Sequence, residues 1–316
     1  MSGLATIKET TEILNEIKQS DLKTAQKEEL LGLIAKFQKH SAVIGTLVPG
    51  RVICRDISCN YLKDDPISVY PLTVPQLSYN PNFALCGYNR ASWEGESAFY
   101  GSIETEKLKG YYTCSLEVLA ELQENNKEID CETFVVGKWI VKKEINLIHI
   151  SGTLKNNSIA VSERYNTWFK SSSKYPENII PLKLIDTYLC DEFVKDVPKN
   201  EKWKYKVSAA YSDFVKKDNW PGLIYPSLKS DGAGYNVALF PETLYDYIEF
   251  ERAALITYYK RGKSITNEIT MEALPDGDLL RWKEIYTHLL PPKMKRWYTG
   301  LSDDNSFENY IDYQDL

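Results

Sequence analysis

The sequence predicts an α+β protein built on a mixed, largely antiparallel sheet with flanking helices. Two observations support this class. Apolar residues recur at helical spacing near the N-terminus and again between residues 182 and 216. Short apolar runs with strand-like composition, separated by turn-forming residues, occupy much of the remaining chain. With 316 residues, the chain can form one large domain or two small ones with an ample core.

A helical hairpin is expected first, within residues 3–40. Its two helices are separated by a break at Ser20-Asp21, where either residue could act as the N-cap of the second helix. The hairpin could be a packed subdomain or an arm that binds a partner or a second copy. We therefore divide the chain into the hairpin (1–46), a main domain (47–250) and a C-terminal extension packed on it (251–316).

The main domain is expected to alternate strands and helices without an internal repeat. A strand-like segment at 48–56 is followed by a long ordered loop, and the charged turn 142–144 is predicted to join two paired strands. The other expected elements are helices at 113–122, 182–196 and 202–216, and strands at 134–141, 145–150, 222–227 and 235–240. Two further apolar runs follow, at 253–259 and 265–271.

Charge and composition exclude several classes of function. The net charge of −6 argues against general affinity for nucleic acid or anionic membranes. No apolar run approaches the ~18–20 residues that span a bilayer. The N-terminus lacks a secretory pattern, so we expect a cytoplasmic protein. The six cysteines form no C-x-x-C pair and the three histidines are far apart, so we expect reduced thiols and no metal site.

The stretch Gly87–Ser102 carries the first candidate site residues. Arg90 lies in a polar, glycine-containing loop, where its guanidinium could grip a phosphate or carboxylate. Tyr100 lies on the strand that follows, where its ring could stack on a heterocycle. The alternatives are a surface arginine in an ion pair and a buried strand tyrosine with a satisfied hydroxyl.

The second candidate stretch runs from Trp220 to Pro241. Ser227 ends an apolar strand, and Asn236 begins the next one after a glycine-rich turn at 231–234. No activating histidine lies nearby in sequence and the G-x-S-x-G elbow is absent, so a serine nucleophile is not supported. The turn lacks the Lys-Ser/Thr ending of a P-loop, so a hairpin explains it better.

Taken together, these stretches resemble the RES domain, a family named for its Arg, Glu and Ser residues. The resemblance covers roughly residues 48–245. Arg55 resembles the first arginine of the family, Arg90 the arginine that precedes the tyrosine, and Tyr100 that tyrosine. Ser227 resembles the serine of the family's late strand, and Asn236 lies further along the chain, after the glycine-rich turn.

The glutamate of the family is matched by a residue of the predicted 113–122 helix. A short insertion, Glu-Lys-Leu-Lys-Gly-Tyr-Tyr, precedes this helix and makes Glu117 the best match, with Glu121 as the alternative. On residue types alone, a carboxylate on the polar face of a helix would explain either position.

The resemblance implies an ADP-ribosyltransferase-like fold with a split sheet that acts on NAD⁺ as substrate without a metal. Relatives are toxins, paired with an antitoxin, that deplete NAD⁺ or modify a protein. Arg55 and Arg90 would hold the pyrophosphate, Tyr100 would pack on the nicotinamide, and Ser227 and Asn236 would line the same site. Glu117 would stabilise the oxocarbenium-like transition state.

Several features of this function stay open at the sequence level. The nucleophile could be water, phosphate or a protein side chain, so the enzyme could be a glycohydrolase, a phosphorylase or an ADP-ribosyltransferase. A non-catalytic nucleotide-binding module is the main alternative. An antitoxin or immunity protein, or a second copy of the chain, are the expected partners.

Overall fold

The computed structural model describes residues 5–37, 43–59, 71, 73–103, 105, 110, 113–116, 129–152, 167, 176–230, 232–261 and 264–284. The α+β class predicted from the sequence is confirmed: the described strands form a mixed sheet, with helices beside it. The chain divides into two compact units. The first comprises Met1–Ile53, Tyr79–Thr113 and Val141–Glu249, and the second comprises Cys54–Ser78, Cys114–Ile140 and Phe250–Leu316.

The first unit contains five strands that come from distant parts of the sequence. The pair β5·β6 is parallel, whereas β1·β5, β6·β7 and β7·β3 are antiparallel. Their hydrogen-bonded order is β1 (Val43–Leu47), β5 (Ile145–His149), β6 (Gly222–Pro226), β7 (Tyr235–Leu239) and β3 (Phe99–Ile103).

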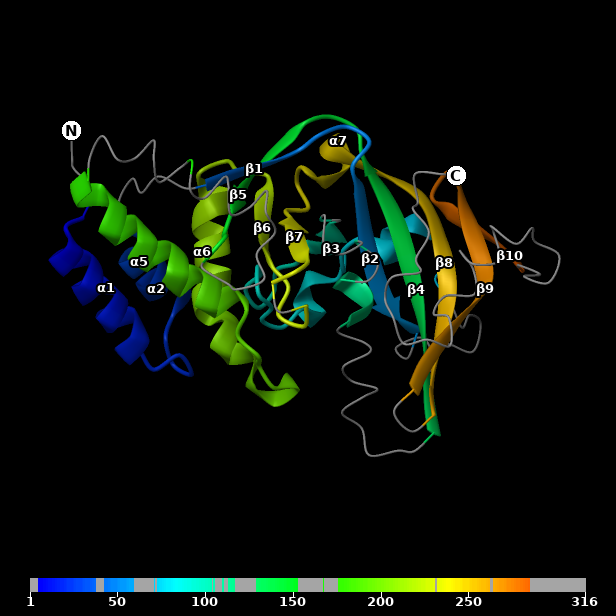
Figure 1. The fold of residues 1–316 in the computed structure, drawn as a ribbon, viewed down its shortest axis with the longest axis horizontal. Helices are drawn as coiled ribbons and strands as arrows, with labels where there is room; N and C mark the ends of the chain where they lie inside the picture. Colours follow the sequence, from blue (N-terminus) through cyan, green and yellow to red (C-terminus); the bar gives the residue numbers. More distant parts are fainter. Residues whose placement is uncertain are drawn as a thin grey trace. The chain divides into compact units, whose positions relative to one another are not determined.

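Helices cover one face of these strands, as Figure 1 shows. Their apolar sides meet Ile148, Leu223 and Ala238 of the sheet in one core, whose burial is the main stabilising contribution to this unit. The covering helices are α1 (Ile7–Gln19), α2 (Lys27–Ala35), α5 (Pro176–Phe193) and α6 (Lys206–Lys217), and the short α7 (Leu244–Tyr247) follows β7. The 3₁₀ segments η3 (Phe83–Leu85) and η4 (Lys199–Tyr205) complete the unit.

The N-terminal helical hairpin is present, but the predicted N-cap of its second helix is wrong. Ser20 ends α1, and α2 begins only after Gln26. Asp21 instead holds a turn, because its carboxylate accepts hydrogen bonds from the backbone N–H of Lys23 and the hydroxyl of Thr24. The first helix has the cap that its sequence permits, a reciprocal pair of hydrogen bonds between Thr6 and Glu9.

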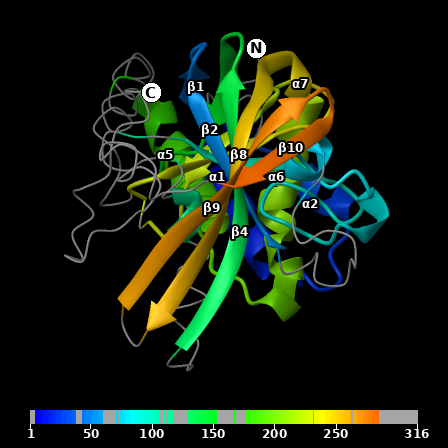
Figure 2. The same ribbon diagram turned by 90° about the vertical axis from the view of Figure 1, so that its right-hand side faces the viewer.

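The second unit consists mainly of long strands, seen side by side in Figure 2. Strands β8 and β9 pair antiparallel, and β9 and β10 form a hairpin in which Gly277 takes a positive φ of 60°. The hydrogen-bonded order is β2 (Val52–Ser58), β4 (Ile129–Val141), β8 (Ile248–Arg261), β9 (Ser264–Asp276) and β10 (Leu279–Glu284), with the 3₁₀ segment η2 at Val74–Leu77.

One predicted strand pairing is wrong. The strands expected at 134–141 and 145–150 exist as β4 and β5, but they do not pair with each other. β4 lies between β2 and β8, and β5 lies between β1 and β6. The charged turn between them does not close a hairpin, because the N–H of Lys142 bonds to the carbonyl of Tyr247 instead. The hairpin predicted for β6 and β7 is confirmed.

Candidate functional site

The loop that carries Arg90 is closed by the hydroxyl of Tyr100. This oxygen accepts a hydrogen bond from the backbone N–H of Ala91 at 3.0 Å, and the hydroxyl of Ser92 lies 3.0 Å away. Within the loop, the N–H of Asn89 bonds to the carbonyl of Ser92 at 2.9 Å. Tyr100 therefore fixes the backbone next to Arg90 from the strand that the loop feeds.

Arg90 itself binds the end of a helix. Its Nη1 donates to the carbonyl oxygens of Phe193 at 2.6 Å and of Lys195 at 2.8 Å, where α5 ends. Its guanidinium carbon lies 5.0 Å from the centroid of the Tyr205 ring, which adds a cation–π contact. The charge suits this position, since the last carbonyls of a helix are partly negative and lack partners within the helix.

The other edge of the Arg90 guanidinium still has donors for a ligand. Nε and Nη2 of Arg90 form no hydrogen bond within the described part of the chain. These two nitrogens form the edge that grips a carboxylate or phosphate with two parallel bonds. Arg90 can therefore cap α5 and still offer one side to an anion.

A short polar row crosses the sheet beside Tyr100. The hydroxyl of Ser102 donates to Oδ1 of Asn236 at 2.7 Å, and these two residues are directly opposite in the register of β3 and β7. Tyr225 of β6 lies opposite Asn236 on its other side. Directly opposite residues project from the same face of a sheet, and Tyr100 shares that face, two residues before Ser102.

Ser227 follows the last residue of β6 and is fully buried, with 0% of its surface exposed. Its backbone is tied into a tight turn: its N–H bonds to the carbonyl of Gly234, and its carbonyl accepts from the N–H of Gly232. Its Oγ has no hydrogen-bond partner in the described part of the chain. A buried hydroxyl without a partner is costly, so its presence in the turn calls for an explanation.

The predicted hairpin turn between β6 and β7 is therefore confirmed, and close packing explains the glycine at position 234. A Cβ on Gly234 would lie 2.2 Å from the hydroxyl oxygen of Thr113. No side chain fits there, so glycine allows Thr113 to approach the backbone of the turn.

The remaining predicted site residues are placed differently. Arg55 lies half-buried on β2 in the second unit. Glu117 and Glu121 lie outside the described residues, although Thr113–Leu116, just before them, are helical. Arg90, Tyr100, Ser227 and Asn236 all belong to the first unit.

The end of α5 also carries a buried carboxylate that sequence reasoning missed. Glu192 is 8% exposed and pairs with Lys195 at 2.5 Å, one residue away from the carbonyl that Arg90 caps. Burial raises the pKa of Glu192, and the attraction of Lys195 offsets this only in part. The cap that Arg90 places on α5 was not predictable either, because a backbone acceptor such as the carbonyl of Phe193 leaves no signature in a sequence.

No group of three or more potential metal ligands is found among the residues that the structure describes. Within the same residues, no helix is both long and apolar enough to cross a membrane. Comparison of the chain with protein-family models and with curated proteins found no match.

Proposed function

We propose that this protein is an NAD⁺-consuming enzyme that cleaves the bond between nicotinamide and ribose, with an ADP-ribosyltransferase-like fold of the RES type. The observation that carries the proposal is the arrangement around Tyr100. Its hydroxyl fixes the backbone next to Arg90, and the polar pair of Ser102 and Asn236 lies on the same sheet face. Residues predicted from separate sequence stretches thus belong to the same unit.

The described side chains suit an anionic nucleotide. The Nε and Nη2 edge of Arg90 would bind one phosphate, since a planar guanidinium matches two phosphate oxygens. The half-buried ring of Tyr100 would pack on the nicotinamide, and Asn236 would bind a ribose hydroxyl through its amide nitrogen.

The reaction breaks the bond between the anomeric carbon of the ribose and the pyridinium nitrogen. Nicotinamide leaves as a neutral molecule with the bonding electrons, so positive charge grows on the sugar. Glu117 would stabilise this charge in the transition state. Water or phosphate then forms the new bond to the anomeric carbon and, for water, a proton is released to solvent.

A cellular role as a toxin, restrained by an antitoxin or immunity protein, would follow from such an activity, because loss of NAD⁺ halts metabolism. A protein side chain in place of water would make the same site an ADP-ribosyltransferase. The second candidate function is a non-catalytic nucleotide-binding module. It is favoured by one observation: Arg90 already serves as the cap of α5.

The proposal is tested by measuring nicotinamide release from NAD⁺ by the purified protein, with and without phosphate. Glu117→Gln and Glu121→Gln, the alternative match, are each compared with the wild type, and loss of release in Glu121→Gln alone would move the catalytic role to Glu121. Release that depends on Glu117 supports the enzyme, and a requirement for phosphate identifies phosphorolysis. Binding of NAD⁺ without release in either buffer, and without transfer to protein, would instead support the non-catalytic module.

A further inference from the structure

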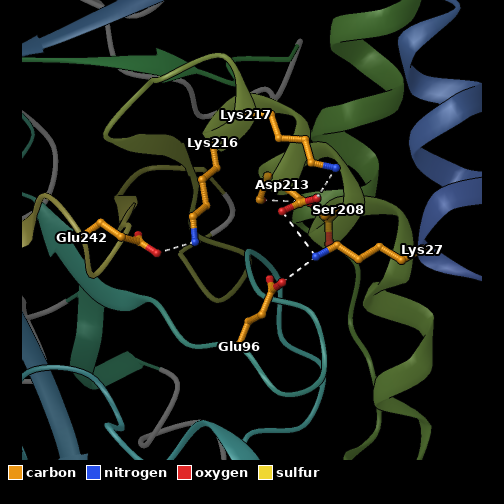
Figure 3. A network of polar contacts seen from close by, with 8 residues as sticks. Lys27, Glu96, Ser208, Asp213, Lys216, Lys217 and Glu242 are labelled. Atoms are coloured by element: carbon orange, nitrogen blue, oxygen red, sulfur yellow. Dashed lines mark hydrogen bonds and ion pairs between the residues drawn. The ribbon is translucent and has the colours of Figure 1, made fainter.

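The segment 87–96, called the Arg90 loop below, is tied to two helices by charged side chains (Figure 3). The ammonium of Lys27, in the first turn of α2, lies 2.5 Å from Oε1 of Glu96 and 3.3 Å from Oδ1 of Asp213. Asp213 belongs to α6, and its other oxygen lies 3.2 Å from Lys217. Lys27 therefore connects the end of the loop to both α2 and α6.

This network is partly shielded from water. The side chain of Asp213 is 9% exposed and that of Lys27 is 20% exposed, so their attraction is screened less than that of a surface pair. Burial alone lowers the pKa of Lys27, but the hydrogen bond and charge of Glu96, together with Asp213, outweigh it and raise the pKa. Lys27 is therefore charged at neutral pH, as the network requires.

A second lysine holds the middle of the loop. Lys206, the first residue of α6, is 5% exposed. Its ammonium donates to the carbonyl of Ala25 at 2.8 Å and lies 5.3 Å from the Tyr88 ring centroid and 5.7 Å from that of Trp93. Lys206 thus binds the chain just before α2 on one side and the aromatic residues of the Arg90 loop on the other.

Trp93 is the point where the two contacts meet. Lys27 lies 5.9 Å from the centroid of the same ring that Lys206 contacts. A tryptophan ring near two cations is attracted to both through the negative charge on its ring faces. Three residues before Trp93, Arg90 occupies the helix cap described above. The loop is thus fixed on both sides of its candidate binding group.

We propose that Lys27 and Lys206 are positioning residues of the candidate site, and that through them the N-terminal helix α2 sets the position of the Arg90 loop. This inference rests on the proposed function, because it assumes that Arg90 meets an anionic ligand. It gives the N-terminal hairpin a role that its sequence does not reveal. Neither lysine touches the ligand; both act through the loop.

The first experiment follows amide hydrogen exchange in the full-length protein. The informative N–H groups are those of Asn89, Gly95 and Glu96, which bond to carbonyls within or beside the loop. In Lys27→Met and in Lys206→Met we expect their exchange to speed up roughly tenfold while the helix interiors keep their protection. Lys216→Met is the matched control, since it removes a pair of similar length (2.6 Å) with Glu242, a residue outside the loop.

The second experiment measures the affinity for NAD⁺ in the same variants by calorimetry. We expect the dissociation constant to rise several-fold in Lys27→Met and Lys206→Met, to be unchanged in Lys216→Met, and to be restored in Lys27→Arg. Glu96→Gln removes the charge of the carboxylate that pairs with Lys27, at a more exposed position. It therefore tests the contact between α2 and the loop if a lysine variant fails to fold.

The outcomes separate the two proposals. If the wild type fails to bind NAD⁺, the proposed function fails, and so does the role of these lysines at a site for it, even where exchange shows the loop loosened. If the wild type binds but loop exchange is unchanged in both variants, the positioning proposal alone is wrong. Faster loop exchange with unchanged affinity would also overturn it, because the loop would then be irrelevant to the ligand.

Discussion

Nη1 of Arg90 lies 2.6 Å from the carbonyl oxygen of Phe193, the last residue of α5, and this bond joins the candidate ligand-binding loop to a helix end. A ligand that binds Arg90 is therefore linked through this side chain to the end of α5 as well. Because the second carbonyl, that of Lys195, lies 2.8 Å from the same nitrogen, the arginine has a fixed orientation before any anion arrives. Such preorganisation lowers the cost of binding.

Replacing Arg90 with alanine should lower both stability and affinity. Two charge-assisted hydrogen bonds to backbone carbonyls are lost, so we expect the free energy of unfolding in urea to fall by about 1.5–3 kcal/mol. The affinity for NAD⁺ by calorimetry should also weaken. Arg281→Ala is the control, because that exposed arginine pairs with Asp276 at the surface and should change stability by less than about 1 kcal/mol. Loss of stability with unchanged affinity would assign Arg90 to structure alone.

The change Tyr100→Phe isolates the hydroxyl that closes the Arg90 loop. The ring keeps its packing against the core, but the N–H of Ala91 and the hydroxyl of Ser92 lose their partner. We expect a loss of about 0.5–1.5 kcal/mol in urea unfolding, together with weaker NAD⁺ binding. Affinity that is identical to the wild type would show that closure of the loop does not serve the ligand.

Ser227→Ala should have the opposite effect on stability. Its buried Oγ has no partner in the described residues, so removing it should raise the free energy of unfolding by about 1 kcal/mol. If the hydroxyl serves the ligand, NAD⁺ binding falls at the same time. Ser102→Ala is the contrasting variant, since it breaks the bond to Asn236 and should destabilise the protein. A destabilised Ser227→Ala protein would show that the hydroxyl is bonded after all.

The buried carboxylate of Glu192 should make stability fall as pH rises. Its pKa in the folded protein is raised above the ordinary 4.5, chiefly by burial, so the folded state binds its proton more tightly than the unfolded chain. The stability that this proton contributes is present below about pH 4.5 and is lost as pH rises through the folded pKa. Urea unfolding of the wild type and of Glu192→Gln is measured from below pH 4.5 to neutral pH. The free energy of unfolding of the wild type should fall relative to that of Glu192→Gln as pH rises.

Glu242→Gln provides the control for that experiment. Burial raises the pKa of Glu242, but the hydrogen bond from Lys216 and its own backbone outweigh this, so the pKa is lowered. Its contribution is present above pH 4.5 and lost as pH falls, the opposite sign to that of Glu192. Equal pH dependence in the two variants would show that the environment of Glu192 has been misassigned.

Local patterns in the sequence predicted most helices and strands, whereas their partners were harder to foresee. The helical spacing of Leu14, Ile17 and Leu33 and the turn between β6 and β7 reflect contacts a few residues apart. The pairing of β4 depends instead on strands far away in the chain. A short turn at 142–144 favours a hairpin locally. In the structure, however, β4 and β5 each pair with strands from distant segments of the chain.

The candidate site shows the same division. The proximity of Arg90 and Tyr100 followed from their short separation on a loop and its strand. The cap on α5 did not, because carbonyl groups carry no residue identity, and Phe193 lies far along the chain. Lys206 was equally hidden: a lysine at the start of a helix is usually solvated, and only tertiary packing buries this one between Ala25 and two aromatic rings.

The discontinuous build of the first unit has a consequence during synthesis. Val43 on β1 pairs with His149 on β5, which in turn pairs with Ile224 on β6. While the ribosome is still making the middle of the chain, the apolar side of the N-terminal hairpin has neither α5 nor α6 to cover it. We expect folding of this unit to wait until β7 has emerged, and nascent chains stalled before that point to depend on chaperones.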